Sequence, residues 1–220
     1  MADCSFDLEI PDAIAASKLF SYGGCVMVRE LLSPHSLAEL SAEAVSAKLA
    51  GERNVLAISD DTEGRGGSPG RAFTSAHGGD VQWRLYNSPT LLKLLTELCD
   101  VAPAPTGGGT YSFYEQPGDF LAVHRDVLAC DLAVITCLSD TGAASAGRGL
   151  LAYPGYIREP LSRVREAGVA AGTPVPLRRG DTVVLLGGIV PHEVAPIPPG
   201  SERIVSVMCY HLAASSNPLS

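Results

Sequence analysis

The sequence has 220 residues, of which 46% are hydrophobic and 18% are charged, and its formal net charge at pH 7 is −8. A chain of this length suits one domain, and its acidic balance argues against a nucleic-acid partner, because such partners are bound through clustered Lys and Arg. The N-terminus lacks the basic region of a secretory signal, and no apolar run approaches the ~18 residues of a membrane span. We therefore expect a cytoplasmic protein without a membrane partner.

A strand and a helix are the first elements that the sequence predicts. Residues 23–29 form a short apolar run that is typical of a β-strand. Residues 33–50 have the apolar spacing of an amphipathic helix. Ser33 is suited to cap this helix, Pro34 to its first turn and Gly51 to its end.

The next segment lacks periodicity. Residues 60–80 are rich in Gly, Ser and Asp, which predicts a loop, and a loop of this length is often a lid over a site. Residues 81–86 alternate in the manner of a strand. Residues 88–98 have a helix start signal followed by helical apolar spacing.

From Thr110 onward the sequence predicts short strands separated by Gly and Pro turns, with one helix at 160–167. This pattern favours a double-sheet barrel, so the expected fold class is α+β, mainly β: a double-stranded β-helix (a jelly-roll or cupin-like barrel) with N-terminal helices packed against it. We expect a single domain over 1–220, in which 1–109 supports a barrel core at 110–212. The predicted strands are 110–115, 119–126, 130–138, 149–153, 182–186, 191–195 and 203–211.

The cysteines give no sign of a zinc site or a disulfide framework, because they are scattered without a Cys-X-X-Cys pair. Cys130 and Cys137 lie on one predicted strand at an odd spacing, 137 − 130 = 7, so they should point to opposite faces and not pair with each other. The six cysteines are Cys4, Cys25, Cys99, Cys130, Cys137 and Cys209.

A possible metal site lies in the second half of the chain. His124 and Asp126 are two residues apart in a predicted strand, so both side chains should point to one face. His192 follows the apolar run at 182–186 and could complete a 2-His-1-carboxylate iron(II) site. The alternative is that the His-Arg-Asp sequence at 124–126 is a common tripeptide without a function and that His192 is an ordinary loop histidine.

Arg203 opens the last long strand, 203 − 192 = 11 residues after His192, and its planar guanidinium matches a carboxylate. With these residues the sequence resembles the Fe(II)/2-oxoglutarate-dependent dioxygenases, whose pattern is His-X-Asp, a distal His and then an Arg on the last barrel strand. A tyrosine and glycine before the metal histidine, Tyr114 and Gly118, make it similar to the prolyl-hydroxylase-like branch. The resemblance covers 110–212.

This resemblance implies Fe(II), 2-oxoglutarate and O2 as cofactors and cosubstrates, with ascorbate as a candidate reductant. It implies hydroxylation of a C–H bond, with release of succinate and CO2, and Arg203 binding the far carboxylate of 2-oxoglutarate. Tyr114 matches a family tyrosine that hydrogen-bonds the cosubstrate, and Thr136 matches a polar partner of the far carboxylate. Tyr114 could instead be a packed core tyrosine, and Thr136 a β-branched strand former.

The substrate cannot be transferred from the family. Trp83, Arg84 and Tyr86 are the first candidates for binding it, and Arg125 and Arg148 are alternative anchors for an anion. We expect a small molecule, such as an amino acid or a biosynthetic intermediate. Hydroxylation of a protein side chain, or desaturation, cyclisation or epoxidation by the same cofactors, stays open, as does a non-enzymatic jelly-roll binding domain. The oligomeric state is open too.

Overall fold

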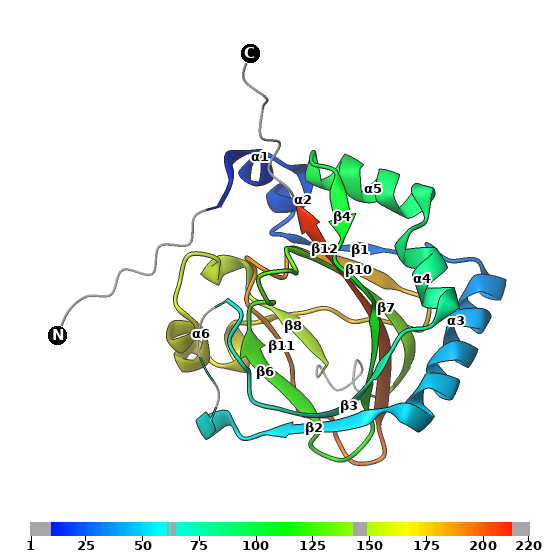
Figure 1. Cartoon of the computed structure of the whole chain (residues 1–220). Coiled ribbons are helices and arrows are strands. Elements are labelled where there is room, and N and C mark those ends of the chain that lie inside the picture. Colours follow the sequence, from blue (N-terminus) through cyan, green and yellow to red (C-terminus); the bar gives the residue numbers. More distant parts are fainter. Residues whose placement is uncertain (1–9, 61, 63–64, 143–148, 213–220) are drawn as a thin grey trace.

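The computed structural model describes residues 10–60, 62, 65–142 and 149–212. Its described part is a curled, antiparallel β-sheet flanked by helices (Figure 1). No helix in these ranges is long and apolar enough to cross a membrane. The helices are α1 (Asp12–Ala15), α2 (Lys18–Ser21), α3 (Pro34–Ala47), α4 (Asp80–Tyr86), α5 (Pro89–Cys99) and α6 (Leu161–Ala167).

The strands follow the order β1-β10-β7-β12-β5-β3-β6-β11-β8-β9, and β2 and β4 pair with β3 and β12 respectively. The first strands along the chain are β1 (Cys25–Val28), β2 (Glu52–Leu56), β3 (Arg71–His77), β4 (Pro103–Pro105), β5 (Thr110–Tyr114) and β6 (Phe120–His124). The others are β7 (Leu132–Thr141), β8 (Leu150–Ala152), β9 (Thr173–Pro174), β10 (Thr182–Leu185), β11 (His192–Val194) and β12 (Glu202–Leu212).

The sheet curls into a barrel at β3. This strand pairs with β2 along one edge and, along the other, with both β6 and β5. β5 continues into the wall formed by β12, β7 and β10, and β6 continues into the wall formed by β11 and β8. The two walls face each other in Figure 1, and the space between them holds the candidate site. This is the expected double-stranded β-helix.

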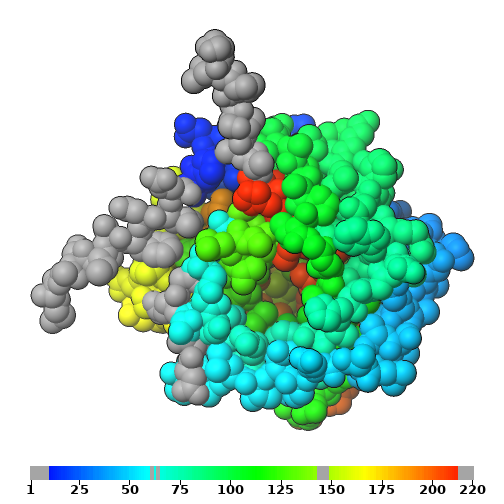
Figure 2. Space-filling model, viewed as in Figure 1, coloured from blue at the N-terminus to red at the C-terminus, as the bar shows by residue number. Residues whose placement is uncertain are grey.

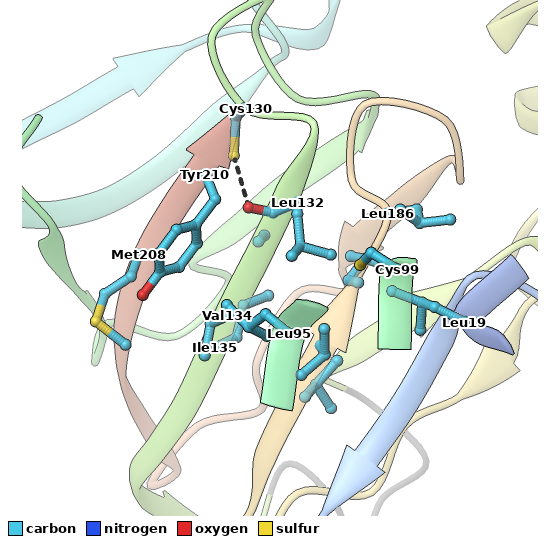
Figure 3. Packing of buried hydrophobic residues seen from close by; sticks show 14 of the residues in the cluster. Leu19, Leu95, Cys99, Cys130, Leu132, Val134, Ile135, Leu186, Met208 and Tyr210 are labelled. Atoms are coloured by element: carbon cyan, nitrogen blue, oxygen red, sulfur yellow. Dashed lines mark hydrogen bonds between the residues drawn. The ribbon is translucent and has the colours of Figure 1, made fainter. Parts of the chain in front are cut away.

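Helices cover the outer faces of both walls. Leu19 of α2 and Leu95 of α5 pack in one apolar cluster with Leu132 and Val134 of β7 (Figure 3). α6 covers the other wall, where its Leu161 and Val164 lie in a cluster with residues of β6 and β8. Each such leucine contributes roughly 2–3 kcal/mol when it is withdrawn from water, so the helices stabilise the walls from outside and leave the inner faces for the site.

Most of the predicted elements are confirmed. The strand at 23–29 is β1, and the helix at 33–50 is α3 followed by a 3₁₀ turn, with the Ser33 hydroxyl accepting the Ser36 N–H. The predicted helices at 88–98 and 160–167 are α5 and α6. The seven strands predicted from residue 110 onward are β5, β6, β7, β8, β10, β11 and β12.

The strand predicted at 81–86 is wrong, because these residues belong to α4. The cause lies in another helix: the carboxylate of Glu43 in α3 accepts the N–H groups of Gly79, Val81 and Gln82. These are backbone donors at the start of α4 that have no partner within the helix itself. A carboxylate at a helix N-terminus also interacts favourably with the helix dipole, so a tertiary contact decides the local structure.

The loop predicted at 60–80 is wrong for its second half, which forms β3. Both edges of β3 are paired, so these residues are a fixed part of the sheet and not a lid. The N-terminal segment 1–109, expected to support the barrel core, contributes β1, β2, β3 and β4 to the sheet itself. The short strands β2, β4 and β9 were not predicted either.

The expectation of no disulfide is also wrong, because Cys130 and Cys209 are bonded, with their Cα atoms 5.0 Å apart. Cys137 is free and buried, so the prediction that Cys130 and Cys137 do not pair is confirmed. Disulfides are rare in a reducing cytoplasm, and the expected cytoplasmic location stays a prediction.

Candidate metal centre

The structure brings His124, Asp126 and His192 together. His124 ends β6 and His192 begins β11, and the two are direct cross-strand partners. Their Nε2 atoms each lie 3.6 Å from Oδ1 of Asp126, and all three ligand atoms lie within 4.8 Å of one another. Within the described residues, this is the one group of three or more His, Cys, Asp or Glu side chains that could hold a metal ion.

Backbone carbonyls orient both imidazoles. Nδ1 of His124 lies 2.8 Å from the carbonyl oxygen of Ala122, and Nδ1 of His192 lies 3.0 Å from that of Val190. A carbonyl can only accept, so each Nδ1 carries a proton and Nε2 is the ring nitrogen left to face a metal ion. Metal-binding histidines are usually fixed in this way by a hydrogen bond to the other ring nitrogen.

The charge state of the group also suits a cation. Burial and the neighbouring His124 lower the pKa of His192 to about 4, so this ring is neutral at pH 7. Burial acts to raise the pKa of Asp126, but His192, His124 and Arg65 outweigh it, so the pKa lies below its usual value and the side chain is a carboxylate. Two imidazoles and one carboxylate are the donor set of a 2-His-1-carboxylate iron(II) site, so the residues fit the expected metal.

This group lines a cavity of about 120 Å³ inside the barrel. Figure 2 shows the molecule hollowed on this face, with the segment that leads into β3 on the rim. The cavity is apolar apart from a few polar groups. Its lining residues besides the three metal-site side chains are Thr110, Ser112, Tyr114, Leu121, Ala133, Ile135, Leu150, Val194, Arg203, Val205 and Val207.

Arg203 and Tyr114 lie at the far end of the cavity, as cross-strand partners on β12 and β5. The Arg203 side chain is 2% exposed, and its Nη1 donates to Oδ2 of Asp140 at 3.1 Å. Its Nε is buried and has no acceptor among the residues that the structure describes. A buried donor without a partner is costly, and a ligand carboxylate would satisfy it, so this end of the cavity fits the far carboxylate of 2-oxoglutarate. Burial raises the pKa of Tyr114, which keeps its hydroxyl protonated.

Thr136 is not brought to the cavity. On β7 the cavity-lining residues are Ala133 and Ile135, and Thr136 points to the opposite face. There its hydroxyl lies 2.9 Å from that of Thr182 on β10. The Thr136 hydroxyl therefore has its hydrogen-bond partner on the neighbouring strand β10 and not in the cavity.

The substrate candidates also lie away from the cavity. Trp83 is 52% exposed on α4 and Arg84 faces Glu39 of α3, while Tyr86 is buried and its hydroxyl contacts the carbonyl of Cys209. Arg125 is buried on the outer side of β6, where it donates to the carbonyls of Ile189, Tyr156, Ile157 and Glu159. Burial lowers the pKa of Arg125 to about 10. Arg148 lies outside the described residues.

Two residues that the sequence did not indicate lie on β3 next to the cavity-lining strand β5. Ser75 and His77 pair with Ser112 and Thr110, which line the cavity. The Ser75 hydroxyl accepts a hydrogen bond from Asn54 of β2, and His77 is exposed. Alternation along β3 could have indicated this strand, but the Gly-rich sequence before it favoured a loop.

Two more residues lie beside the metal group. The backbone carbonyl of Gly187 accepts the N–H of Asp126 at 2.8 Å, and a Cβ at this glycine would collide with Oδ2 of that carboxylate. Arg65 is paired with Asp131 beside the Asp126 loop. Neither contact could be predicted from the sequence, because each joins two segments that are far apart along the chain.

Solved structures contain the same fold, although no protein-family model matches the sequence and no significant match is found among curated proteins. The epimerase SnoN, in complex with Fe3+, alpha-ketoglutarate and nogalamycin RO, matches 92% of this chain and 83% of its own with a TM-score of 0.64 and 18% identity. A Pseudomonas putida prolyl-4-hydroxylase matches 92% of this chain and 100% of its own, with a TM-score of 0.61 and 18% identity. HygX from Streptomyces hygroscopicus, with nickel and 2-oxoglutarate bound, matches 90% of this chain and 87% of its own, with a TM-score of 0.63 and 12% identity. At such low identities the likeness shows the fold.

Proposed function

We propose that this chain is an Fe(II)- and 2-oxoglutarate-dependent oxygenase that hydroxylates a C–H bond of a small molecule. The observation that carries the proposal is the group formed by His124, Asp126 and His192, in which both Nε2 atoms and a carboxylate oxygen converge at one end of a cavity. Arg203 supplies a buried cation at the other end. Proteins of the same fold, bound to iron or nickel and 2-oxoglutarate, support this assignment.

Each side chain then has a defined task. His124, His192 and Asp126 hold the metal, and the guanidinium of Arg203 binds the far carboxylate of the cosubstrate, with the Tyr114 hydroxyl as a further donor. When bound, the iron and 2-oxoglutarate supply the oxidising power that converts C–H to C–OH with O2, while succinate and CO2 are released. The apolar walls exclude bulk water, which strengthens the interaction of Arg203 with a carboxylate.

The primary substrate enters, in this proposal, from the hollow face of the barrel. Thr110 and Ser112 of β5 line the cavity and offer polar contacts there in place of the aromatic residues of α4. The relatives by fold include SnoN with nogalamycin RO bound, which supports a small-molecule substrate. We propose hydroxylation as the reaction, and desaturation, cyclisation or epoxidation with the same cofactors as the alternative.

Binding and turnover test the proposal separately. Metal-free protein is titrated with Mn(II) and then with 2-oxoglutarate by calorimetry, and we expect 2-oxoglutarate to bind only after the metal. The Fe(II) protein is then incubated with 2-oxoglutarate and a panel of small molecules while succinate is measured. Mn(II) binding without any affinity for 2-oxoglutarate would refute the oxygenase and favour a metal-binding jelly-roll domain without enzymatic activity.

A further inference from the structure

A buried ion pair includes Arg203, which lines the cavity. Asp140 on β7 is the cross-strand partner of Arg203 on β12, and their side chains are 1% and 2% exposed. Oδ2 of Asp140 accepts a hydrogen bond from Nη1 of Arg203 at 3.1 Å. This hydrogen bond ties one nitrogen of the guanidinium to the wall, so the guanidinium has a set direction at this end of the cavity.

The surroundings restrict the guanidinium further. Tyr114 lies directly across from Arg203 on the other neighbouring strand, β5. A Cβ at Gly149 would lie 2.8 Å from Nη1 of Arg203, and Gly149 has φ +119°, a conformation that favours glycine. The Nη1 side is therefore enclosed by Asp140 and Gly149, while Nε finds no acceptor among the described residues.

In this arrangement one nitrogen of the Arg203 guanidinium binds Asp140, while its Nε has no acceptor among the described residues. A guanidinium presents its donors in a fixed fork, so holding one nitrogen fixes the direction of the others. A buried arginine without a partner would also be strongly unfavourable. Asp140 thus stabilises the charge of Arg203 and fixes which N–H groups remain for a ligand in the cavity.

We propose that Asp140 is a positioning residue for the cosubstrate: it orients Arg203 so that the free edge of the guanidinium binds the far carboxylate of 2-oxoglutarate. The inference rests on the proposed function and adds a residue to it. Asp140 does not touch the cosubstrate, and its effect passes through Arg203. It therefore acts only on ligands that possess a far carboxylate.

The test compares two ligands on the Mn(II)-loaded protein by calorimetry. 2-Oxoglutarate has a far carboxylate, whereas 2-oxobutyrate keeps the 2-oxo acid group that faces the metal and lacks the far carboxylate. In Asp140→Ala we expect 2-oxoglutarate to bind about tenfold more weakly, because a guanidinium that is no longer held makes a poorer charge-assisted hydrogen bond to the far carboxylate, with 2-oxobutyrate unchanged. Asp140→Asn keeps an acceptor for Nη1 and is expected to recover most of the affinity.

Asp119→Asn is the matched control, because Asp119 is another buried aspartate paired with an arginine, Arg53. Thermal unfolding of each variant shows that it is folded. Equal weakening of both ligands in Asp140→Ala, equal loss in the Asn and Ala variants, or the same loss in Asp119→Asn would overturn the positioning role.

The wild type separates this inference from the proposed function. If it binds the two ligands equally, the cosubstrate assignment of Arg203 fails and the role of Asp140 fails with it. If it prefers 2-oxoglutarate and Asp140→Ala keeps that preference, only the inference on Asp140 fails.

Discussion

Gly187→Ala adds one methyl group where the structure has no room for it. The backbone of Gly187 is bonded to that of Asp126 at 2.8 Å, and a Cβ would collide with the Asp126 carboxylate. Because this hydrogen bond holds the two backbones together, the carboxylate must rotate away from His124 and His192. The apo fold should lose only about 1–3 kcal/mol, the usual cost of one extra methyl in a packed place. Metal affinity should fall by about 100-fold, the upper range for changes beside a metal ligand.

Calorimetric titration of Mn(II) into the variant and the wild type measures this effect, with urea unfolding in parallel. Gly155→Ala is the matched control, because a Cβ at Gly155 meets nothing within 4 Å. Unchanged Mn(II) affinity in Gly187→Ala would show that Asp126 is not a ligand in the orientation described. An equal loss in Gly155→Ala would show that the effect is not specific to the metal centre.

Three further predictions follow from the same geometry. His192→Ala should abolish Mn(II) binding and leave the thermal unfolding temperature within a few degrees, since the ring adds little to the apolar core; full metal occupancy would remove His192 from the site. Arg203→Lys should weaken 2-oxoglutarate about 10- to 100-fold by calorimetry, because an ammonium lacks the fork and would pair with Asp140; equal affinities would exclude Arg203 as the anchor. Reduction of the Cys130–Cys209 bond, which spans 79 residues, should lower the free energy of unfolding by about 4.5 kcal/mol in denaturant titrations; no change on reduction would contradict the bond.

The convergence of His124, Asp126 and His192 was predictable because much of its signal is local. Alternation in the predicted strand 119–126 placed His124 and Asp126 on one face; β6 ends at His124, yet the two side chains do meet. The apolar run before His192 marks the strand that leads to it. The barrel strands were predictable from residue 110 onward for the same reason, since turn residues separate short apolar runs.

Features that depend on contacts between distant segments were not predictable. Residues 81–86 form a helix because Glu43, in another helix, accepts N–H groups at its start. Residues 71–77 form the strand β3 because β2 pairs with one of its edges and β5 with the other. Both faces of β7 are buried, one against helices and one in the cavity, so polarity does not reveal which way Thr136 points. The residues that support the site, Asp140 and Gly187, lie in the same category.

The pairs that build the site also bear on how the chain folds. His192 pairs with His124 across 192 − 124 = 68 residues, and Arg203 pairs with Tyr114 across 203 − 114 = 89 residues. Closing such long loops costs entropy before any contact is gained, and sheets dominated by distant pairings fold slowly, typically in milliseconds to seconds. We therefore expect the metal ligands to converge late in refolding, after the local hairpins and helices have formed. A chain that ends before β11 should contain His124 and Asp126 and yet have no high-affinity metal site.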